Sequence, residues 1–148
     1  CEPGGQPVSP LANGGAFGGK SDSVAPAAAR VLADRLGRTV RVLFAREDVG
    51  RHNAVDKVVG RMLLDGALPA AGLGLFVSGR ASFELVQKAW AAGFSMLVAV
   101  SGPTSLAVLT ARRAGLHLVG FVRGERLNVY SPERIADDPR WGSLGAAP

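Results

Sequence analysis

The sequence predicts a single α/β domain built around a mainly parallel sheet. A length of 148 residues is enough for one domain with a hydrophobic core. Apolar residues make up 47% of the chain and charged residues 20%, which is typical of globular proteins. Short apolar segments of strand type alternate with segments of helix type, and the connections between them are short. This alternation is typical of a parallel α/β layer structure.

The first third of the chain predicts a loop, a helix and a strand, in that order. Residues 1–23 are rich in Gly, Pro, Ser and Asn and show no sustained period, so we expect loop. Alanines and leucines dominate residues 24–36, and a following glycine is a plausible stop, which predicts a helix. The stretch TVRVLFA, residues 39–45, alternates apolar residues with polar or small ones, which is the period of a strand.

A helix is expected to follow that strand, with Asn53 as its N-cap residue. Its apolar residues recur at i, i+3, i+4, i+7 and i+8 and predict one buried stripe, formed by Val55, Val58, Val59, Met62 and Leu63. The pair Asp65-Gly66 is expected to end the helix.

The rest of the chain repeats this alternation. Residues 73–78, 96–100 and 117–122 predict strands, and the tail from Ser131 is expected to be irregular. Helices are predicted after Ser82, to about residue 92, and over residues 105–114. On the first of these helices, Phe83, Val86 and Trp90 share one side, and Gly93 stops it. The predicted core consists of Val55, Val59, Met62, Phe76, Phe83, Val86, Val98, Val100, Leu106 and Leu118.

The charge of the chain favours anionic ligands. Lys and Arg number 17 and Asp and Glu 12, which gives a net charge of +5. Basic residues are not clustered among aromatics, which make up only 6%, so a phosphorylated small molecule is favoured over nucleic acid. The single cysteine, Cys1, excludes an internal disulfide framework and a cysteine-based metal cluster. No leader is expected, and the uncharged stretch of residues 89–111 contains too many Gly, Ser and Pro residues for a membrane span.

Three polar segments follow the predicted strands at the position where parallel α/β sheets bind ligands, beyond the carboxyl ends. They are REDVGRHN, VSGRAS and AVSGPTS. Glycines there allow close backbone approach, helix N-terminal amides attract anions, and Arg46, Arg51 and Arg80 are suited to phosphate. One shared anionic ligand is the economical hypothesis. The alternative is that these residues only form turns and cap helices.

His52 and Asp56 lie four residues apart and thus on one helical face, but two such groups make an incomplete metal site. The HExxH motif is absent, so no metal site is expected. The alternative is that His52 and Asp48 orient the turn, with Lys57 pairing Glu47 or Asp56. Glu84 and Lys88, at i and i+4, are predicted to form a solvated pair on one helix. Cys1 has no identifiable base beside it in sequence.

Four stretches resemble, in order and spacing, the C-terminal domain of the formate dehydrogenase accessory sulfurtransferases, the FdhD family. They are REDVGRHNAVDKVVG, LFVSGRASFELVQKA, LVAVSGPTSLAV and LVGFVRGERLNVYS, and the likeness covers about residues 46–133. The resemblance implies a three-layer, cytidine-deaminase-like α/β fold, a homodimer and a cytoplasmic location. It further implies that sulfur from a cysteine desulfurase passes to the molybdenum of the bis(molybdopterin guanine dinucleotide) cofactor before formate dehydrogenase takes that cofactor up. The cofactor would be a bound substrate, with no metal held by the protein itself.

The resemblance also implies where that cofactor binds. In the family, a segment near the C-terminus contacts it. This segment corresponds to Phe121, Val122, Arg123, Gly124, Glu125 and Arg126. To these the argument from strand ends adds Arg51, His52, Asn53, Ser78, Gly79 and Arg80 as candidate cofactor-binding residues.

Two departures from the family define the remaining alternatives. The family's CxxC loop has no counterpart in this chain, so no catalytic residue is assigned and sulfur transfer by the chain alone is not expected. Residues 11–49, with the loop GGAFGGK, instead resemble the molybdopterin-binding subunit of xanthine dehydrogenase-type molybdenum hydroxylases. We therefore predict a hydroxylase-like segment at 1–45, the accessory-protein domain at 46–135 and a tail at 136–148. The chain could then be a truncated sulfurtransferase, a non-catalytic guanine nucleotide or molybdopterin-binding module, or a hydroxylase fragment.

Overall fold

The computed structural model describes residues 8–14, 33, 39–123 and 126–131, and of residues 8–14 and 123 it describes the backbone. The helix predicted at 24–36 and the predicted irregular tail beyond Ser131 lie almost wholly outside these residues. Gly124 and Glu125 also lie outside them.

The described chain forms a six-stranded sheet and three helices, which confirms a mostly parallel α/β fold. The strands are β1 (Val8–Gly14), β2 (Val40–Arg46), β3 (Gly74–Val77), β4 (Met96–Ala99), β5 (His117–Arg123) and β6 (Arg126–Val129). Their order across the sheet is β2-β1-β3-β4-β5-β6. Every neighbouring pair is parallel except β5 and β6, which are antiparallel. The helices are α2 (Arg51–Leu64), α3 (Phe83–Ala91) and α4 (Ser105–Ala114).

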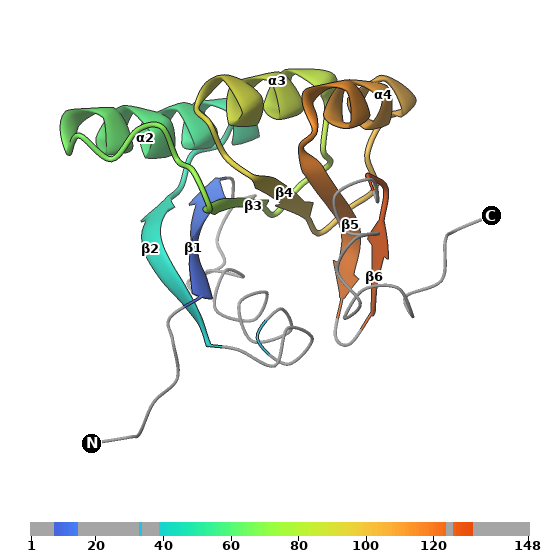
Figure 1. The fold of residues 1–148 in the computed structure, drawn as a ribbon, viewed down its shortest axis with the longest axis horizontal. Coiled ribbons are helices and arrows are strands. Elements are labelled where there is room, and N and C mark those ends of the chain that lie inside the picture. The colour runs from blue at the N-terminus through green and yellow to red at the C-terminus, as the bar shows by residue number, and fades with distance from the viewer. Residues whose placement is uncertain (1–7, 15–32, 34–38, 124–125, 132–148) are drawn as a thin grey trace.

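The three helices cover one face of the sheet, as Figure 1 shows. Successive strand residues point to opposite faces, so β3 and β4 contribute to two separate hydrophobic clusters. Leu75, Val77, Leu97 and Ala99 pack beneath the helices with buried residues of all three. Phe76 and Val98 belong to the second cluster, on the other face, together with Val119 and Val122. Both faces of the central strands are therefore buried, which explains their continuous apolar sequence.

The predicted core is largely confirmed, with one error. Val55, Met62, Phe76, Val86, Val98 and Leu118 are buried, and Val59, Phe83 and Val100 are half-buried. The prediction that Leu106 lies in the core is wrong, because this residue is 53% exposed on α4. The buried faces of α2 and α3 also differ slightly from the predicted stripes, since Leu63 and Trp90 are 66% and 57% exposed. Small residues replace them in the core: α2 buries Ala54 and α3 buries Ala89.

The loop predicted over residues 1–23 is wrong at residues 8–14, which form β1. This strand lies between β2 and β3 and pairs in parallel with both. Its sequence, VSPLANG, contains Pro, Gly and Asn, which are depleted in strands, so no local signal marks it. Pairing with two strands that are distant in sequence makes it a strand. The sequence also predicts no separate strand at residues 126–129, where the structure has β6.

The predicted N-cap of α2 is wrong as well. The N-cap residue is Gly50, and the Ala54 N–H donates to the Gly50 carbonyl at 3.1 Å, so the helix begins before Asn53. Ser82 is the N-cap residue of α3, as predicted. The predicted bounds of α4 are confirmed. None of the helices in the described part of the chain is long and apolar enough to cross a membrane.

Candidate functional site

The parallel strands end along one edge of the sheet. Gly14 of β1 lies opposite Arg46 of β2 on one side and opposite Val77 of β3 on the other, and Val77 lies opposite Ala99 of β4. The chain leaves β2, β3 and β4 at this edge and enters α2, α3 and α4. The structure thus brings together the ends of the three polar segments, as the sequence predicts.

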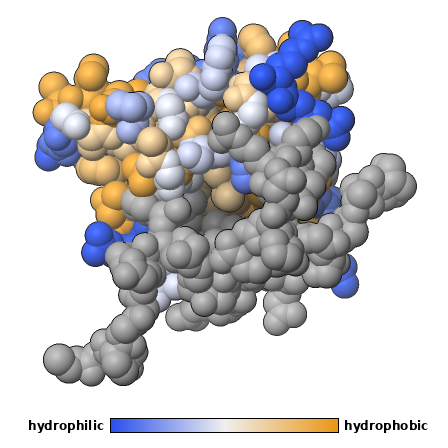
Figure 2. Space-filling view, in the orientation of Figure 1, coloured by the Kyte–Doolittle hydropathy of each residue, from blue (hydrophilic) through white to orange (hydrophobic). Residues whose placement is uncertain are grey.

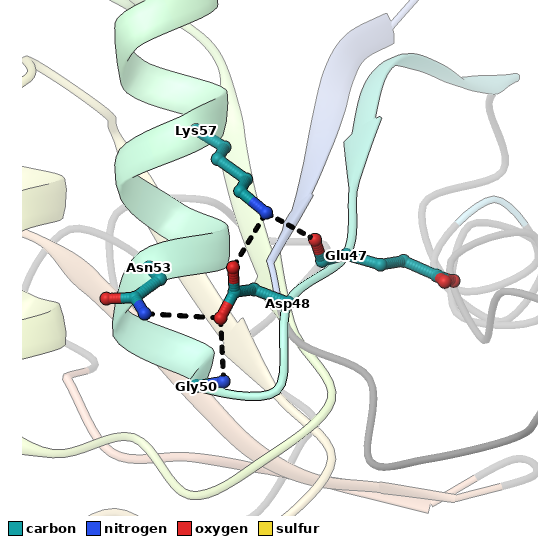
Figure 3. Close-up of polar contacts among 5 residues, drawn as sticks. All are labelled: Glu47, Asp48, Gly50, Asn53 and Lys57. Carbon is teal, nitrogen blue, oxygen red and sulfur yellow. Dashed lines mark hydrogen bonds and ion pairs between the residues drawn. The ribbon is translucent and has the colours of Figure 1, made fainter.

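The β2–α2 loop is held by the Asp48 carboxylate, shown in Figure 3. Asp48 Oδ1 accepts hydrogen bonds from the Gly50 N–H at 2.9 Å and from the Asn53 amide at 3.2 Å. Asp48 Oδ2 lies 2.7 Å from Lys57 Nζ, which also donates to the Glu47 carbonyl oxygen at 3.1 Å. The Glu47 side chain points away from this group in Figure 3. The four interactions fix the loop to the first two turns of α2.

These contacts correct the pairing predicted for Lys57. Its partners are the Asp48 carboxylate and a backbone carbonyl, and the side chains of Glu47 and Asp56 are not among them. The bond from Lys57, followed by those from Gly50 and Asn53, lowers the pKa of Asp48 from 3.8 to about 2. Asp48 therefore orients this turn, which agrees with the alternative interpretation of the sequence for that residue. Asn53, a candidate ligand residue, already gives one amide hydrogen to this carboxylate.

Arg51, the first residue of α2, reaches the loop after β3. A Cβ atom added at Gly79 would lie 3.3 Å from Arg51 Cδ, so the glycine leaves room for the arginine side chain. Arg51 Nε is buried and makes no hydrogen bond among the described residues. A buried donor without an acceptor is costly, and a bound ligand is one of the explanations for such a group. Two of the candidate segments therefore meet at Arg51 and Gly79.

The pair predicted between Glu84 and Lys88 on α3 is wrong. Lys88 Nζ instead lies 2.6 Å from both carboxylate oxygens of Asp56, on α2. The pKa of Glu84 is lowered mainly by its own backbone N–H and next by the Ser82 hydroxyl, with the smallest contributions from His52 and Arg51. His52 and Arg51, at the start of α2, thus lie close enough to Glu84 to act on its carboxylate, which spacing along one helix did not reveal.

The described residues of the predicted segment 121–126 lie on β5 and β6, at one side of the sheet. Phe121 is 48% exposed and has a φ of 53°. Val122 is only 6% exposed and packs in the second hydrophobic cluster, so only its backbone is available to a ligand. Arg126 is exposed at the start of β6 and lies opposite Arg123 in the ladder.

The remaining candidates differ in accessibility. His52, Ser78 and Gly79 are half-buried and Arg80 is exposed. Within the described residues, no group of three His, Cys, Asp or Glu side chains could hold a metal ion. Cys1 lies outside these residues. Arg51 and Arg80 are themselves hydrogen-bond donors and cations, which suit an anion.

The fold and this edge define an α/β domain with arginine donors at the ends of its parallel strands. The family model described as FdhD/NarQ family matches residues 29–136, so the chain belongs to the FdhD/NarQ family. This finding confirms the resemblance read from the sequence.

Individual relatives agree with the family match. The chain is 65% identical over 89 residues to the sulfur carrier protein FdhD of Nocardia farcinica, which covers 60% of this chain and 32% of that protein. It is 54% identical over 95 residues to the protein of the same name from Saccharolobus solfataricus, covering 64% and 37%. A crystal structure of a candidate formate dehydrogenase accessory protein from Desulfotalea psychrophila matches with 42% identity and a TM-score of 0.52, over 59% of this chain and 37% of that one.

The chain spans about a third of the length of the curated relatives that it matches. The family match begins at residue 29, within the segment predicted from the sequence to be hydroxylase-like. The division of the chain at residues 45 and 46 stays a prediction.

Proposed function

We propose that this chain is the cofactor-holding C-terminal part of a formate dehydrogenase accessory sulfur carrier. The observation that carries this proposal is the 65% identity to a sulfur carrier protein FdhD. The family match, residues 29–136, includes both the charged motif around Arg51 and the segment at residues 121–126. In the complete protein, sulfur would come from a cysteine desulfurase and pass to the molybdenum of the bis(molybdopterin guanine dinucleotide) cofactor for formate dehydrogenase.

The role of the described residues in this function is to bind the cofactor as a substrate. The diphosphate groups of that cofactor are anionic, and the strand-end edge offers the unpaired Arg51 Nε and the exposed Arg80. Phe121–Arg126 would hold a further part of the same molecule. The proposal includes a homodimer, a cytoplasmic location and a three-layer, cytidine-deaminase-like arrangement, all of which rest on the family.

Isothermal titration calorimetry tests the binding role. Guanosine diphosphate should bind more tightly than guanosine, because the charged donors act on the phosphates. The preference should weaken as salt rises, since ions screen exposed contacts. Equal affinity for nucleoside and diphosphate would contradict the proposal.

A non-catalytic binding module is the second candidate, and the cysteine content favours it. The chain has a single cysteine, Cys1, and no CxxC pair. A thiolate transfers sulfur efficiently when neighbouring groups activate and orient it, and nothing in the sequence around Cys1 supplies such groups.

Complementation distinguishes the two candidates. The chain, expressed in a strain that lacks its accessory sulfurtransferase, should not restore formate dehydrogenase activity. It should also carry no persulfide after incubation with a cysteine desulfurase. Restored activity that disappears in Cys1→Ser would show that the terminal thiol serves in transfer, and would favour the sulfurtransferase.

A further inference from the structure

Phe121 occupies a backbone conformation that is unfavourable for its residue type. Its φ of 53° is the only positive φ of a non-glycine residue in the described part of the chain. A left-handed conformation at a bulky residue persists only where surrounding contacts hold it, and such residues cluster at functional sites.

A β-bulge causes this conformation. Val119 and Gly120 lie opposite Val129 and Asn128, but Arg123 lies opposite Arg126, so the register shifts by one residue. Phe121 and Val122 of β5 thus face Leu127 alone. Val119 and Val122 both pack in the second hydrophobic cluster although they are three positions apart, where a regular strand would place residues two apart on one face.

The bulge turns the Phe121 side chain toward the loop after β4. A Cβ atom added at Gly102 would lie 2.6 Å from Phe121 Cζ and 2.9 Å from Cε2, so the ring lies directly on the Gly102 backbone. In a regular strand, Phe121 and not Val122 would share the face of Val119. The ring at Gly102 and the side chain of Val122 in the core are therefore two results of one backbone arrangement.

Neighbouring contacts hold the loop close to β5. The Phe121 N–H donates to the Ser101 carbonyl at 3.4 Å, a long bond. A Cβ atom at Gly120 would meet Pro103 Cδ and Tyr130 Cε2, each at 3.1 Å. Strand β5 is therefore anchored at Gly120, and the strained residue follows immediately.

We propose that Phe121 and Gly102 form a latch with two positions. In the closed position, which the structure shows, the ring covers Gly102 and Val122 fills the second cluster. In the open position, Phe121 returns to a negative φ, lies opposite Leu127 and replaces Val122 in that cluster. The pairing of Val119 and Gly120 then continues without a shift, so Val122 lies opposite Arg126.

The open position changes the loop after β4 and strand β5 at once. It uncovers the backbone of the loop after β4, and it moves Phe121 and Val122, which belong to the segment proposed to hold the cofactor. The latch thereby couples the two regions, and its test needs no ligand.

Nitrogen-15 relaxation dispersion on the 148-residue chain tests the latch. The amides of Gly102, Phe121, Val122 and Leu127 should report one shared exchange process, with a minor state of about 0.1 to 10%. Phe121→Gly should abolish that process, because glycine accepts a positive φ without strain and has no ring to move. Flat dispersion at these amides in the unchanged chain would overturn the proposal.

A second variant pushes the latch open. Gly102→Ala places a methyl group where the ring lies, so the signals of Phe121, Val122 and Leu127 should shift together toward the open state. Gly60→Ala is the matched control, because a Cβ atom at Gly60 meets nothing within 4 Å. Shifts limited to the immediate neighbours of residue 102 would overturn the proposal, and the wild-type and Phe121→Gly measurements decide it if Gly102→Ala does not fold.

Discussion

The ammonium group of Lys88 lies 2.6 Å from both carboxylate oxygens of Asp56, so one ion pair joins α2 to α3. The side chains are 32% and 56% exposed, and pairs of this kind contribute about 0.2 to 1 kcal/mol. A double-mutant cycle with Asp56→Asn and Lys88→Gln should give a coupling energy in that range, measured by urea unfolding. The coupling should fall as salt rises.

The ion pair of Arg61 and Asp65 is the matched control, because it lies at the C-terminal end of α2 and joins no second helix. Its coupling should be about 0.3 to 0.5 kcal/mol, as for other i, i+4 pairs. A coupling near zero for Asp56 and Lys88 would show that the pair contributes no measurable stability.

The lowered pKa of Asp48 makes the folding stability depend on pH. Because the folded state lowers this pKa from 3.8 to about 2, the ionised carboxylate stabilises the fold fully at pH values above 3.8. That contribution is lost as the pH falls through about 2. The difference in melting temperature between the chain and Asp48→Asn should therefore be constant above the ordinary pKa and shrink below it.

The cause of this pKa can be tested separately. Lys57→Gln removes the largest contribution, so the pKa of Asp48 should move back toward 3.8 when the carboxyl carbon is titrated by NMR. An unchanged titration would show that the bonds from Gly50 and Asn53 suffice.

Core truncations should separate the buried positions from the exposed ones. Val98 is fully buried between strands, so Val98→Ala should lower the free energy of unfolding by about 1 to 3 kcal/mol. Val59 is half-buried, and Val59→Ala should cost less. Leu64 is 83% exposed, so Leu64→Ala should change stability by less than about 0.5 kcal/mol. Equal effects at Val98 and Leu64 would contradict the two-faced burial of the sheet.

Arg51 should contribute to the binding of a diphosphate. Its Nε is buried without an acceptor, and a hydrogen bond to a charged group contributes about 1.5 to 3 kcal/mol. Arg51→Gln should therefore weaken guanosine diphosphate binding by about tenfold or more in calorimetry. Arg61→Gln is the control, since Arg61 pairs with Asp65 at the other end of α2. If both variants bind equally well, Arg51 is not a ligand of the phosphate groups.

The sequence by itself determined the elements whose signals are local. The period of two in β2, the helix stripe from Val55 to Met62 and the cap of α3 lie within short stretches, so the fold class and most of the core could be predicted. The four motifs were enough to indicate the family, because long runs of mixed residue types in fixed order are specific. The gathering of three polar segments followed from the rule that parallel strands end at one edge.

Only the tertiary structure decided what depends on contacts between distant residues. Strand β1 lacks local strand character and exists because β2 and β3 pair with it on both sides. Lys88 pairs with Asp56 of another helix rather than with Glu84 four residues away, because the packing of α2 on α3 brings those charges within reach. The bulge that places the Phe121 ring on Gly102 arises from the register of β5 against β6 and the loop after β4, and no pattern along the chain records such a register.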